Sequence, residues 1–427
     1  MWNKSCGVLR AVTRQCTVGL MAGIWLASVV PASADAVTSW NEITLKAVTI
    51  GRAGAAGYLD TALVHAAIHD AVQAFEGRFE PYYTSIPNAS GSPSAAVAAA
   101  AYGVLVGIYP AQKPSLDTDY LNYLTAQGLV GDPGLAVGQA AAAALLTQYR
   151  PPVAVPAFTG SNEPGAWRPT PSYIGAPPTP PSFAPMATPY LVTTTPYTLL
   201  RPSQFRPQPP PPMTSQQYVR EYDEVKAYGA RFSSVRSAAQ TDLAYFWSEN
   251  FVAQWNRTLR AIATAHITNL GDSARLFALA NLATADAVIS CWETKYHFNF
   301  WRPITAIQLG DTDGNPDTVA DPTWEPLINT PNYPDYTSGA NNVTAAMVTT
   351  LQHFFGTDDF AFTITSNAPL AVQKSRDFTR FSDAADQVVN ARILLGIHFR
   401  SADEEARQQG TRVAHWTFQK FLRPVTP

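Results

Sequence analysis

Cysteine is scarce in this chain of 427 residues, which contains only three. Cys6 and Cys16 lie in the first 34 residues, a segment that has the features of a cleaved leader. Cys291 is then the only cysteine of the mature chain, so we expect no internal disulfide and a fold stabilised by packing. Cys291 lies in an apolar helical run, which favours a buried structural residue over a nucleophile.

Charge is also low, because Asp, Glu, Lys and Arg make up 14% of the chain and the formal net charge is −3. No basic run and no stripe of alternating basic and aromatic residues occurs, so a nucleic-acid partner is not expected. The fingerprints of serine hydrolases, P-loop enzymes and dinucleotide-binding proteins are absent as well. The length and the 46% of hydrophobic residues allow one large domain or two smaller ones.

The first 34 residues resemble a secretory signal. Lys4, Arg10 and Arg14 precede a short apolar run at residues 17–30, and residues 32–34 (ASA) form a cleavage site. A membrane anchor is the less favoured alternative because the run is too short to span comfortably. Cleavage removes three cations and no acids, which takes the formal charge from −3 to −6. We therefore predict an exported protein, periplasmic or extracellular, without stable membrane insertion.

The mature chain is predicted to be all-α, because apolar residues recur at helical spacing and alternating strand patterns are scarce. A long helix is expected at residues 238–267, and another is expected to begin at Asp272 or Ser273 and to run towards Trp301. Thr214 or Ser215 is a suitable cap for a helix that continues to residue 228. The remaining predicted helices cover residues 59–75, 94–109, 135–149, 340–355, 384–395 and 404–422.

We divide the chain into the leader (1–34), an N-terminal helical part (35–149), a proline-rich connecting segment (150–214) and a C-terminal helical part (215–427). Proline removes donors and blocks helix in the connecting segment. A disordered linker is one interpretation. We favour an ordered, extended wrap because Trp167, Tyr173, Tyr190 and Phe205 give the segment apolar surface to bury.

Three short segments carry the chemistry, and the first is KYHFNFWRP at Lys295–Pro303. Lys295 and Arg302 are seven residues apart, which returns them to nearly the same face of a helix. Proline at 303 disfavours helix at Arg302, so the helix is expected to end there. Aromatic neighbours indicate burial, and buried cations need a partner such as a bound anion.

The other two segments are PDYTSGAN at Pro334–Asn341 and RILLGIH at Arg392–His398. Ser338 and Gly339 are expected to start a helix, where free backbone amides bind anions, although such a pair is often only a cap. Gly396 can bend the chain so that His398 returns to the side of Arg392. Three cations, one hydroxyl and one imidazole suit a tetrahedral oxyanion such as phosphate or vanadate.

The ordered set K-x6-RP, S-G and R-x5-H resembles the vanadium-dependent haloperoxidase and phosphatidic acid phosphatase type 2 superfamily. Three further stretches are similar to its bacterial haloperoxidase-like branch: VHAAIHDAV at Val64–Val72, AYFWSENFVAQWNR at Ala244–Arg257 and DTDGNPDTVADPTW at Asp311–Trp324. The resemblance covers most of the mature chain. It implies an all-α fold built around two four-helix bundles.

The resemblance also implies roles for individual residues. Lys295, Arg302 and Arg392 would hold the equatorial oxygens of vanadate, and Ser338 and the Gly339 amide would donate further hydrogen bonds. His398 would be the apical ligand of vanadium, or the nucleophile towards a phosphoester, since phosphate can occupy the same site. Hydrogen peroxide, polarised by Lys295, a halide (bromide or iodide) and an organic acceptor would be the substrates.

One residue departs from the family pattern P-S-G-H, because Ala340 stands where the acid–base histidine is expected. General acid–base help is worth roughly 10²–10⁴ in rate. Asn341 and Asn342 can supply hydrogen bonds only, and His297 is about 200° around the helix from Lys295. Asp403 follows His398 by five residues, not the four of the phosphatase pattern, which leaves carboxylate support of the imidazole open. A haloperoxidase, a phosphatase and an inactive oxyanion-binding relative all remain open.

Two other groups of residues are weaker candidates. His65 and His69 have the spacing of a metal pair, but the glutamate of the zinc-protease motif is missing, so a packing or hydrogen-bonding role is favoured. Asp311, Asp313, Asn315 and Asp317 alternate as in a calcium loop. Pro316 and the lack of a closing glutamate favour turns there, with calcium as the alternative.

Overall fold

Helices make up most of the regular structure in the computed structural model, which describes residues 35–52, 54–172 and 182–425. The predicted leader with Cys6 and Cys16, and Tyr173 of the connecting segment, lie outside the described residues. The N-terminal helices are α1 (Ala36–Gly51), α2 (Gly57–Glu76), α3 (Pro93–Ile108), η1 (Pro110–Gln112), α4 (Lys113–Ala126) and α5 (Gly134–Leu146).

The remaining elements lie on the C-terminal side of residue 170. Two short pairs of strands occur, β1 (Pro171–Ser172) with β2 (Ser182–Phe183) and β3 (Asp359–Thr365) with β4 (Ser375–Arg380), both antiparallel. The helices are η2 (Pro189–Thr193), α6 (Gln216–Tyr228), α7 (Ala238–Phe246), α8 (Phe251–His266), α9 (Leu270–Phe298), α10 (Pro303–Gln308), η3 (Gly310–Thr312), α11 (Gly339–Phe355), α12 (Phe381–Leu394) and α13 (Arg400–Lys420).

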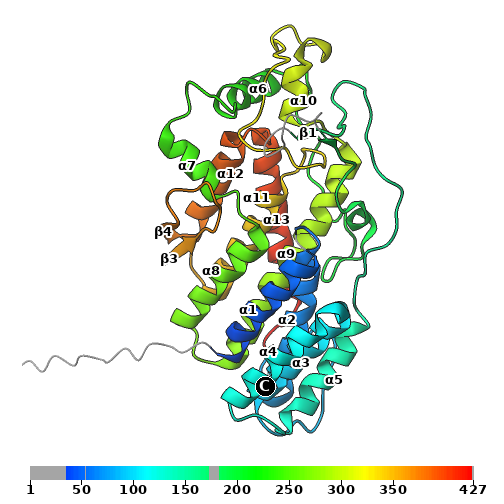
Figure 1. The fold of residues 1–427 in the computed structure, drawn as a ribbon, viewed down its shortest axis with the longest axis vertical. Helices are drawn as coiled ribbons and strands as arrows, with labels where there is room; N and C mark the ends of the chain where they lie inside the picture. The colour runs from blue at the N-terminus through cyan, green and yellow to red at the C-terminus, as the bar shows by residue number, and fades with distance from the viewer. Residues whose placement is uncertain (1–34, 53, 173–181, 426–427) are drawn as a thin grey trace, which may run out of the picture. The chain divides into compact units, whose positions relative to one another are not determined.

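The long helices form two bundles, which confirms the all-α class. In the first, α3 packs on α1, α2 and α5, and in the second, α11 packs on α9, α12 and α13. Small residues let α3 and α5 approach closely, because a Cβ added at Gly138 would clash with the carbonyl oxygen of Ala96. Helix α9 also packs against α2, so it joins the two bundles (Figure 1).

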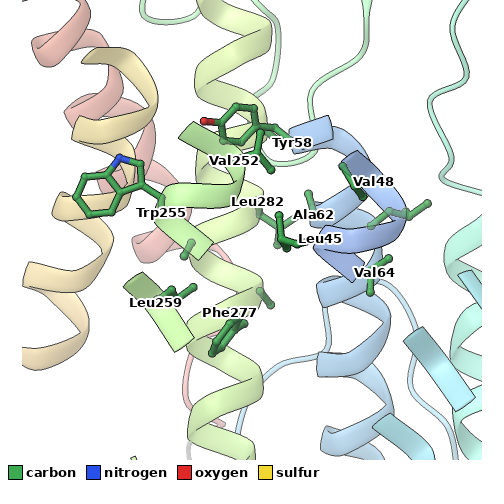
Figure 2. Packing of buried hydrophobic residues seen from close by; sticks show 14 of the residues in the cluster. Leu45, Val48, Tyr58, Ala62, Val64, Val252, Trp255, Leu259, Phe277 and Leu282 are labelled. Atoms are coloured by element: carbon green, nitrogen blue, oxygen red, sulfur yellow. The ribbon is translucent and has the colours of Figure 1, made fainter. Parts of the chain in front are cut away.

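The core around α9 explains why this helix is apolar on every side. Leu45 of α1, Ala62 of α2 and Leu282 of α9 lie together, and α8 adds Trp255 and Leu259 (Figure 2). Helix α9 is long and apolar enough to span a bilayer, but its apolar stretch is entirely buried within the protein. This is the pattern of a central core helix surrounded by other helices.

Several predicted helix boundaries were wrong. Residues 238–267 form two helices rather than one, because Asn250 accepts a hydrogen bond from the Val252 amide (2.9 Å) and starts α8. Helix α9 begins at Leu270, capped by Asn269 through a 2.9 Å bond from the Asp272 amide, and not at Asp272 or Ser273. Ser215 caps α6 as predicted. The β3–β4 hairpin was not predicted, although Phe362 and Ile364 alternate with exposed residues.

The proline-rich segment packs as an extended chain against the helices in the part that is described. It runs along one side of the helices in Figure 1, and its regular structure in the described residues is limited to the β1–β2 pair and the short helix η2. Trp167 is fully buried, and its amide donates to the Asn299 carbonyl at the end of α9 (2.8 Å). Tyr190 and Leu191 are also buried, so these residues fit the predicted ordered wrap.

Candidate oxyanion-binding site

Lys295 and Arg302 do not share a helix face, contrary to the prediction. Helix α9 ends at Phe298, where Asn299 adopts a left-handed conformation (φ 48°), and Arg302 is the cap residue of α10, which starts at Pro303. Asparagine tolerates this conformation better than most residues, so the chain turns three residues earlier than expected. Both cations are nevertheless fully buried, and they lie 5.0 and 4.9 Å from the ring centroid of Tyr333.

Backbone carbonyls hold the two cationic side chains in place. Lys295 Nζ donates to the carbonyl oxygens of Pro334 (2.6 Å) and Asp335 (3.0 Å). Arg302 Nε donates to Tyr333 O (2.8 Å), and its Nη1 donates to Ile397 O (2.6 Å). Burial lowers the pKa of the Lys295 ammonium to about 7, because the charged form loses its hydration.

His398 lies beside Arg302 because the chain turns sharply after α12. Gly396 has a φ of 77°, which glycine adopts without strain, and its Cβ position is blocked by the Gly229 carbonyl oxygen. His398 Nε2 then lies 3.1 Å from Arg302 Nη1, and its Nδ1 lies 2.7 Å from Asp335 Oδ1. The sequence predicted a return of the imidazole to the side of Arg392; the hydrogen-bonding neighbours of the ring are Arg302 and Asp335, and Arg392 acts on it electrostatically.

The surroundings of His398 define its protonation. Burial and the charges of Arg302, Lys295 and Arg392 lower the pKa of His398 well below its usual value, so the ring is neutral. A neutral ring that donates Nδ1–H to Asp335 keeps a lone pair on Nε2. Burial also raises the pKa of Asp335 to about 7. The sequence interpretation gave Asp335 no role, although it lies in the quoted segment, three residues before Ser338.

Ser338 and Gly339 start α11, but the serine hydroxyl does not cap it. Ser338 adopts an extended cap conformation with no bond from its side chain to the helix amides. Its hydroxyl instead lies 3.4 Å from Asn341 Nδ2, which donates to Asp403 Oδ1 at 2.7 Å. The first amides of α11 are therefore left for another acceptor, which is the arrangement that favours anions.

Arg392 and Gly339 line a cavity of about 390 Å³. Arg392 is 8% exposed, and its closest hydrogen bond is a long one of 3.4 Å to the Trp247 carbonyl oxygen. Tyr333 lines the same cavity, and the cationic groups of Lys295 and Arg302 lie over its ring. The remaining wall is largely aromatic and apolar and includes Tyr58, Phe251, Val288, Trp292 and Val343.

Several comparisons with known proteins point to one fold. Residues 275–427 match the family model of the second helical-bundle domain of VCPO. Vanadium chloroperoxidase of Curvularia inaequalis is 32% identical over 168 residues, which is 32% of this chain and 27% of that protein. Among solved structures, the first bacterial vanadium-dependent iodoperoxidase superposes with a TM-score of 0.73 at 23% identity, over 91% of this chain and 98% of the other.

A holo-type bacterial vanadium-dependent chloroperoxidase gives a TM-score of 0.70 at 18% identity, over 87% of this chain and 93% of the other. The chain has the vanadium haloperoxidase fold. The predicted fold is thus confirmed, and the matched second bundle contains all of the predicted site residues. The chain spans about a quarter of the length of the fungal relative, so that relative's activity does not pass directly to it.

The residues of this vanadium haloperoxidase fold suit a tetrahedral oxyanion. Among the described residues, Arg302 Nη2 and Arg392 Nε are buried and have no hydrogen-bond partner. A buried donor left unpaired costs about 1–3 kcal/mol, so two such guanidinium groups favour an anionic guest. Arg392 also has no carboxylate within 4.0 Å in the described part of the chain. Vanadate or phosphate would supply the missing acceptor oxygens.

The other predicted candidates lie apart from this site. His297 is exposed and faces Arg206, at 3.4 Å, so it does not take the place of the histidine missing at Ala340. His65 Nε2 is bonded to Asn41 Nδ2 (2.8 Å), and His69 Nε2 is bonded to the Glu80 carbonyl oxygen (3.0 Å), in agreement with packing roles.

The acidic loop after α10 forms turns in the described structure. Asp313 accepts bonds from the Asn315 amide (2.8 Å) and from the Thr318 hydroxyl, and Asn315 accepts from the Asp317 amide (3.0 Å). Within the described ranges, no group of three or more His, Cys, Asp or Glu side chains could hold a metal ion. These hydrogen bonds are those of the turns that the sequence favoured.

Proposed function

We propose that this chain is an exported vanadate-dependent haloperoxidase that oxidises bromide or iodide with hydrogen peroxide. One observation carries the proposal: guanidinium nitrogens of Arg302 and Arg392 that are buried and unpaired lie near a neutral histidine, His398. The Nε2 lone pair of that histidine faces Arg302 Nη1 at 3.1 Å, on the side where the oxyanion would bind. Proteins of the same fold are described as vanadium-dependent iodoperoxidase and chloroperoxidase.

Each residue has a role that its surroundings support. Arg302 and Arg392 would balance the charge of the oxyanion through their free nitrogens, with Lys295 beside them. The Gly339 amide and the Ser338 hydroxyl would donate further hydrogen bonds. His398 would bind vanadium through Nε2, and Asp335 would orient the ring from Nδ1. When bound, vanadate supplies a Lewis acid that activates hydrogen peroxide towards halide.

The cavity gives the small substrates a place next to the oxyanion. Its volume of about 390 Å³ exceeds what peroxide and a halide ion occupy, so an organic acceptor also fits. Arg392 lies in its wall and would attract the halide. Phe251, Trp292 and Tyr333 make the wall aromatic, which suits an aromatic acceptor.

Phosphoester hydrolysis on the same site is the second candidate, with His398 as the nucleophile. Ala340 lines the cavity where the family histidine is expected, so its methyl group leaves that position without a proton donor. A leaving alkoxide depends strongly on such a donor, and for this reason we place peroxidase activity first. An oxyanion-binding protein without turnover is the third reading.

The decisive experiment purifies the mature chain, adds vanadate and measures bromide and iodide oxidation with peroxide beside hydrolysis of p-nitrophenyl phosphate. Halide oxidation that requires vanadate is expected. Hydrolysis alone would replace the proposal by the phosphatase, and retained vanadate without either activity would leave the binding protein.

A paired set of arginine variants tests whether the anion occupies the proposed place. Arg392→Met is expected to weaken vanadate binding roughly tenfold or more, because a charge-assisted hydrogen bond is worth about 1.5–3 kcal/mol. It should not reduce stability, since Arg392 has no ion-pair partner in the described residues. Arg407→Met, which removes an exposed arginine paired with Asp386, is the control and should leave vanadate affinity unchanged.

Export remains part of the proposal, and the start of α1 supports the cleavage site. Asp35, the residue after the predicted cleavage site, caps α1 by accepting a 2.7 Å bond from the Thr38 amide. Cleavage after residue 34 would keep Asp35 and the whole of α1 in the mature chain. N-terminal sequencing of protein recovered from the medium or periplasm should begin at Asp35; a chain that keeps residues 1–34 in the cell would refute export.

A further inference from the structure

Asp403 is a buried acid in the site to which the proposed function assigns no role. It lies in the first turns of α13 and is 0% exposed. Its Oδ1 accepts the 2.7 Å bond from Asn341, while its Oδ2 has no partner among the described residues. A buried, unpaired carboxyl oxygen is costly unless it serves a ligand or a reaction.

The backbone fixes Asp403 next to the start of α11. The Ser338 amide donates to the Ala402 carbonyl oxygen (2.8 Å), which ties the first residues of α11 to the first turn of α13. The Ser338 hydroxyl also lies near the Asp403 carboxyl and acts on its pKa, but it does not reach hydrogen-bond geometry with Oδ2. The acid therefore lies beside the hydroxyl that is expected to contact the oxyanion.

Four charged side chains of the site interact electrostatically with the Asp403 carboxyl. Lys295 at the end of α9, Arg302 before α10 and Arg392 at the end of α12 all interact electrostatically with Asp403, and so does the carboxylate of Asp335. Burial raises the pKa of Asp403 well above its usual value, so its resting form is a neutral acid. A neutral acid can donate to an oxyanion that an ionised carboxylate would repel.

The alternatives for proton transfer are poor among the described residues at the start of α11, since Lys295 donates to the Pro334 and Asp335 carbonyl oxygens and the Asp335 carboxyl faces His398. Ala340 has no titratable group, and His297 faces away towards Arg206 at an exposed position. Asn341 and Asn342 have amide side chains, which do not exchange protons near neutral pH. Asn342 Nδ2 already donates a hydrogen bond to Gln409 Oε1 (2.7 Å). Asp403 is the group in contact with the start of α11 that can both give and accept a proton.

We propose that Asp403 is the proton donor and acceptor of the oxyanion site. It would replace, as general acid and base, the histidine that is absent at position 340. This inference rests on the proposed peroxidase function. The carboxyl would give its proton to a hydroxyl of the bound oxyanion, which departs as water. The resulting carboxylate would take one proton from the incoming hydrogen peroxide, so that a hydroperoxide anion replaces the departed hydroxide and the charges balance. Asp403 thus ends each turnover as the acid with which it began, and no electrons move at this residue.

Substitution by an amide separates proton transfer from binding. Asp403→Asn is expected to lower kcat roughly 10²-fold or more, as loss of general acid–base catalysis does. Vanadate affinity should change by only a few fold, because asparagine has nearly the same shape and can still donate. Glu404→Gln, at the exposed neighbouring carboxylate, is the matched control and should keep both values.

A second variant tests the exchange of roles with position 340. In the double variant Asp403→Asn with Ala340→His, the new imidazole should recover at least tenfold of the lost kcat. That gain should exceed the effect of Ala340→His in the unmodified chain, where Asp403 is still present. Equal gains in both backgrounds would show that the two positions do not share a role, and would overturn the inference.

A spectroscopic readout does not depend on turnover. Infrared difference spectra on adding sulfate should show the carbonyl band of a protonated carboxyl shifting in the unmodified chain and in Glu404→Gln, but not in Asp403→Asn. The same shift in Asp403→Asn, or kcat retained by that variant, would overturn the role of Asp403 alone. A chain that binds neither vanadate nor sulfate would overturn the proposed function with it.

Discussion

The imidazole of His398 is held from two sides, by Asp335 at Nδ1 (2.7 Å) and by Arg302 at Nε2 (3.1 Å). This contact with Arg302 occupies the lone pair that vanadium would take, so the guanidinium must give up that bond when vanadate binds. Its free Nη2 shows that the same group has spare donor capacity for the oxyanion. Vanadate binding would therefore replace the hydrogen bond between Arg302 and His398 by contacts of both residues with the ligand.

Removal of the imidazole should abolish vanadate retention. We expect His398→Ala to lower vanadate affinity more than the roughly 10–100-fold typical of losing an outer-shell partner, because His398 would be the direct ligand. Equilibrium dialysis followed by vanadium analysis measures this. His297→Ala removes an exposed histidine outside the site and should retain vanadate fully. Equal retention by both variants would remove His398 from the site.

Anion binding should weaken as pH rises through neutrality. The pKa of Lys295 is lowered to about 7, so the ammonium is present below this pH and lost above it. The pKa of Asp335 is raised to about 7, so a negative charge appears over the same range. Both changes disfavour an anion at higher pH. We expect sulfate, which stays a dianion throughout, to bind roughly tenfold or more weakly at pH 8.5 than at pH 6.

Calorimetric titration with sulfate across this range is the measurement. Lys295→Arg keeps a positive charge at every pH and should flatten most of the dependence. Lys113→Arg, at an exposed surface lysine, should leave the pH dependence as it is. Sulfate affinity that is constant between pH 6 and pH 8.5 in the unmodified chain would contradict the assignment of Lys295 to the anion site.

The sequence indicated the residues of the candidate site, but it did not predict how the chain brings them together. Ser338, Gly339 and the three cations were recognised from residue type and order, whereas Asp335 and Tyr333 were not assigned a role. Arg302 contacts Tyr333 across 31 positions of the chain, Asp335 across 33 and His398 across 96, and no local pattern encodes contacts over such separations. The helix-face argument for Lys295 failed because Asn299 ended α9 early.

At the scale of single elements, the turn after α12 decides where His398 lies. Gly396→Ala is expected to destabilise the protein by about 1–2 kcal/mol for the left-handed backbone and by roughly 1–3 kcal/mol more for the clash with Gly229. Gly356→Ala is the matched control, because that glycine has φ 73° and open space around it, so only the first cost applies. Urea unfolding measures the difference, and equal losses would refute a tight turn at Gly396.

Segments with a long helical repeat of apolar residues were correctly predicted as helices, whereas the predicted first and last residues of the helices were less accurate. Residues 59–75 and 94–109 agree with α2 and α3 within two residues. The break at Asn250 was missed because a single capping side chain interrupts an otherwise continuous apolar pattern. The hairpin of β3 and β4 was missed because it is short, and its aromatic residues pack beside Phe381 of α12, a contact that only the tertiary structure reveals.

At the scale of the whole described chain, α9 is common to both bundles. Its N-terminal half packs with α2 and α8, as Phe277 and Leu282 show in Figure 2, and its C-terminal end carries Lys295. The described residues from 35 onward form one compact unit. Loosening the first bundle should therefore loosen the site as well, even though the proposed oxyanion-binding residues lie in the second bundle and the first contributes Tyr58 of α2 to the cavity wall.

Leu63→Ala tests this coupling, since Leu63 is fully buried on α2 and its truncation should cost about 2–5 kcal/mol. We expect one cooperative unfolding transition, with far-UV circular dichroism and tryptophan fluorescence shifting together to lower urea concentration. Sulfate should raise the midpoint of both signals in the unmodified chain and in the variant, because a ligand of the native state stabilises everything that unfolds with its site. Leu121→Ala, at an exposed leucine of α4, should change neither signal by more than about 0.5 kcal/mol. Two separate transitions, with sulfate shifting only one of them, would show that α9 does not bind the two bundles into a single cooperative unit.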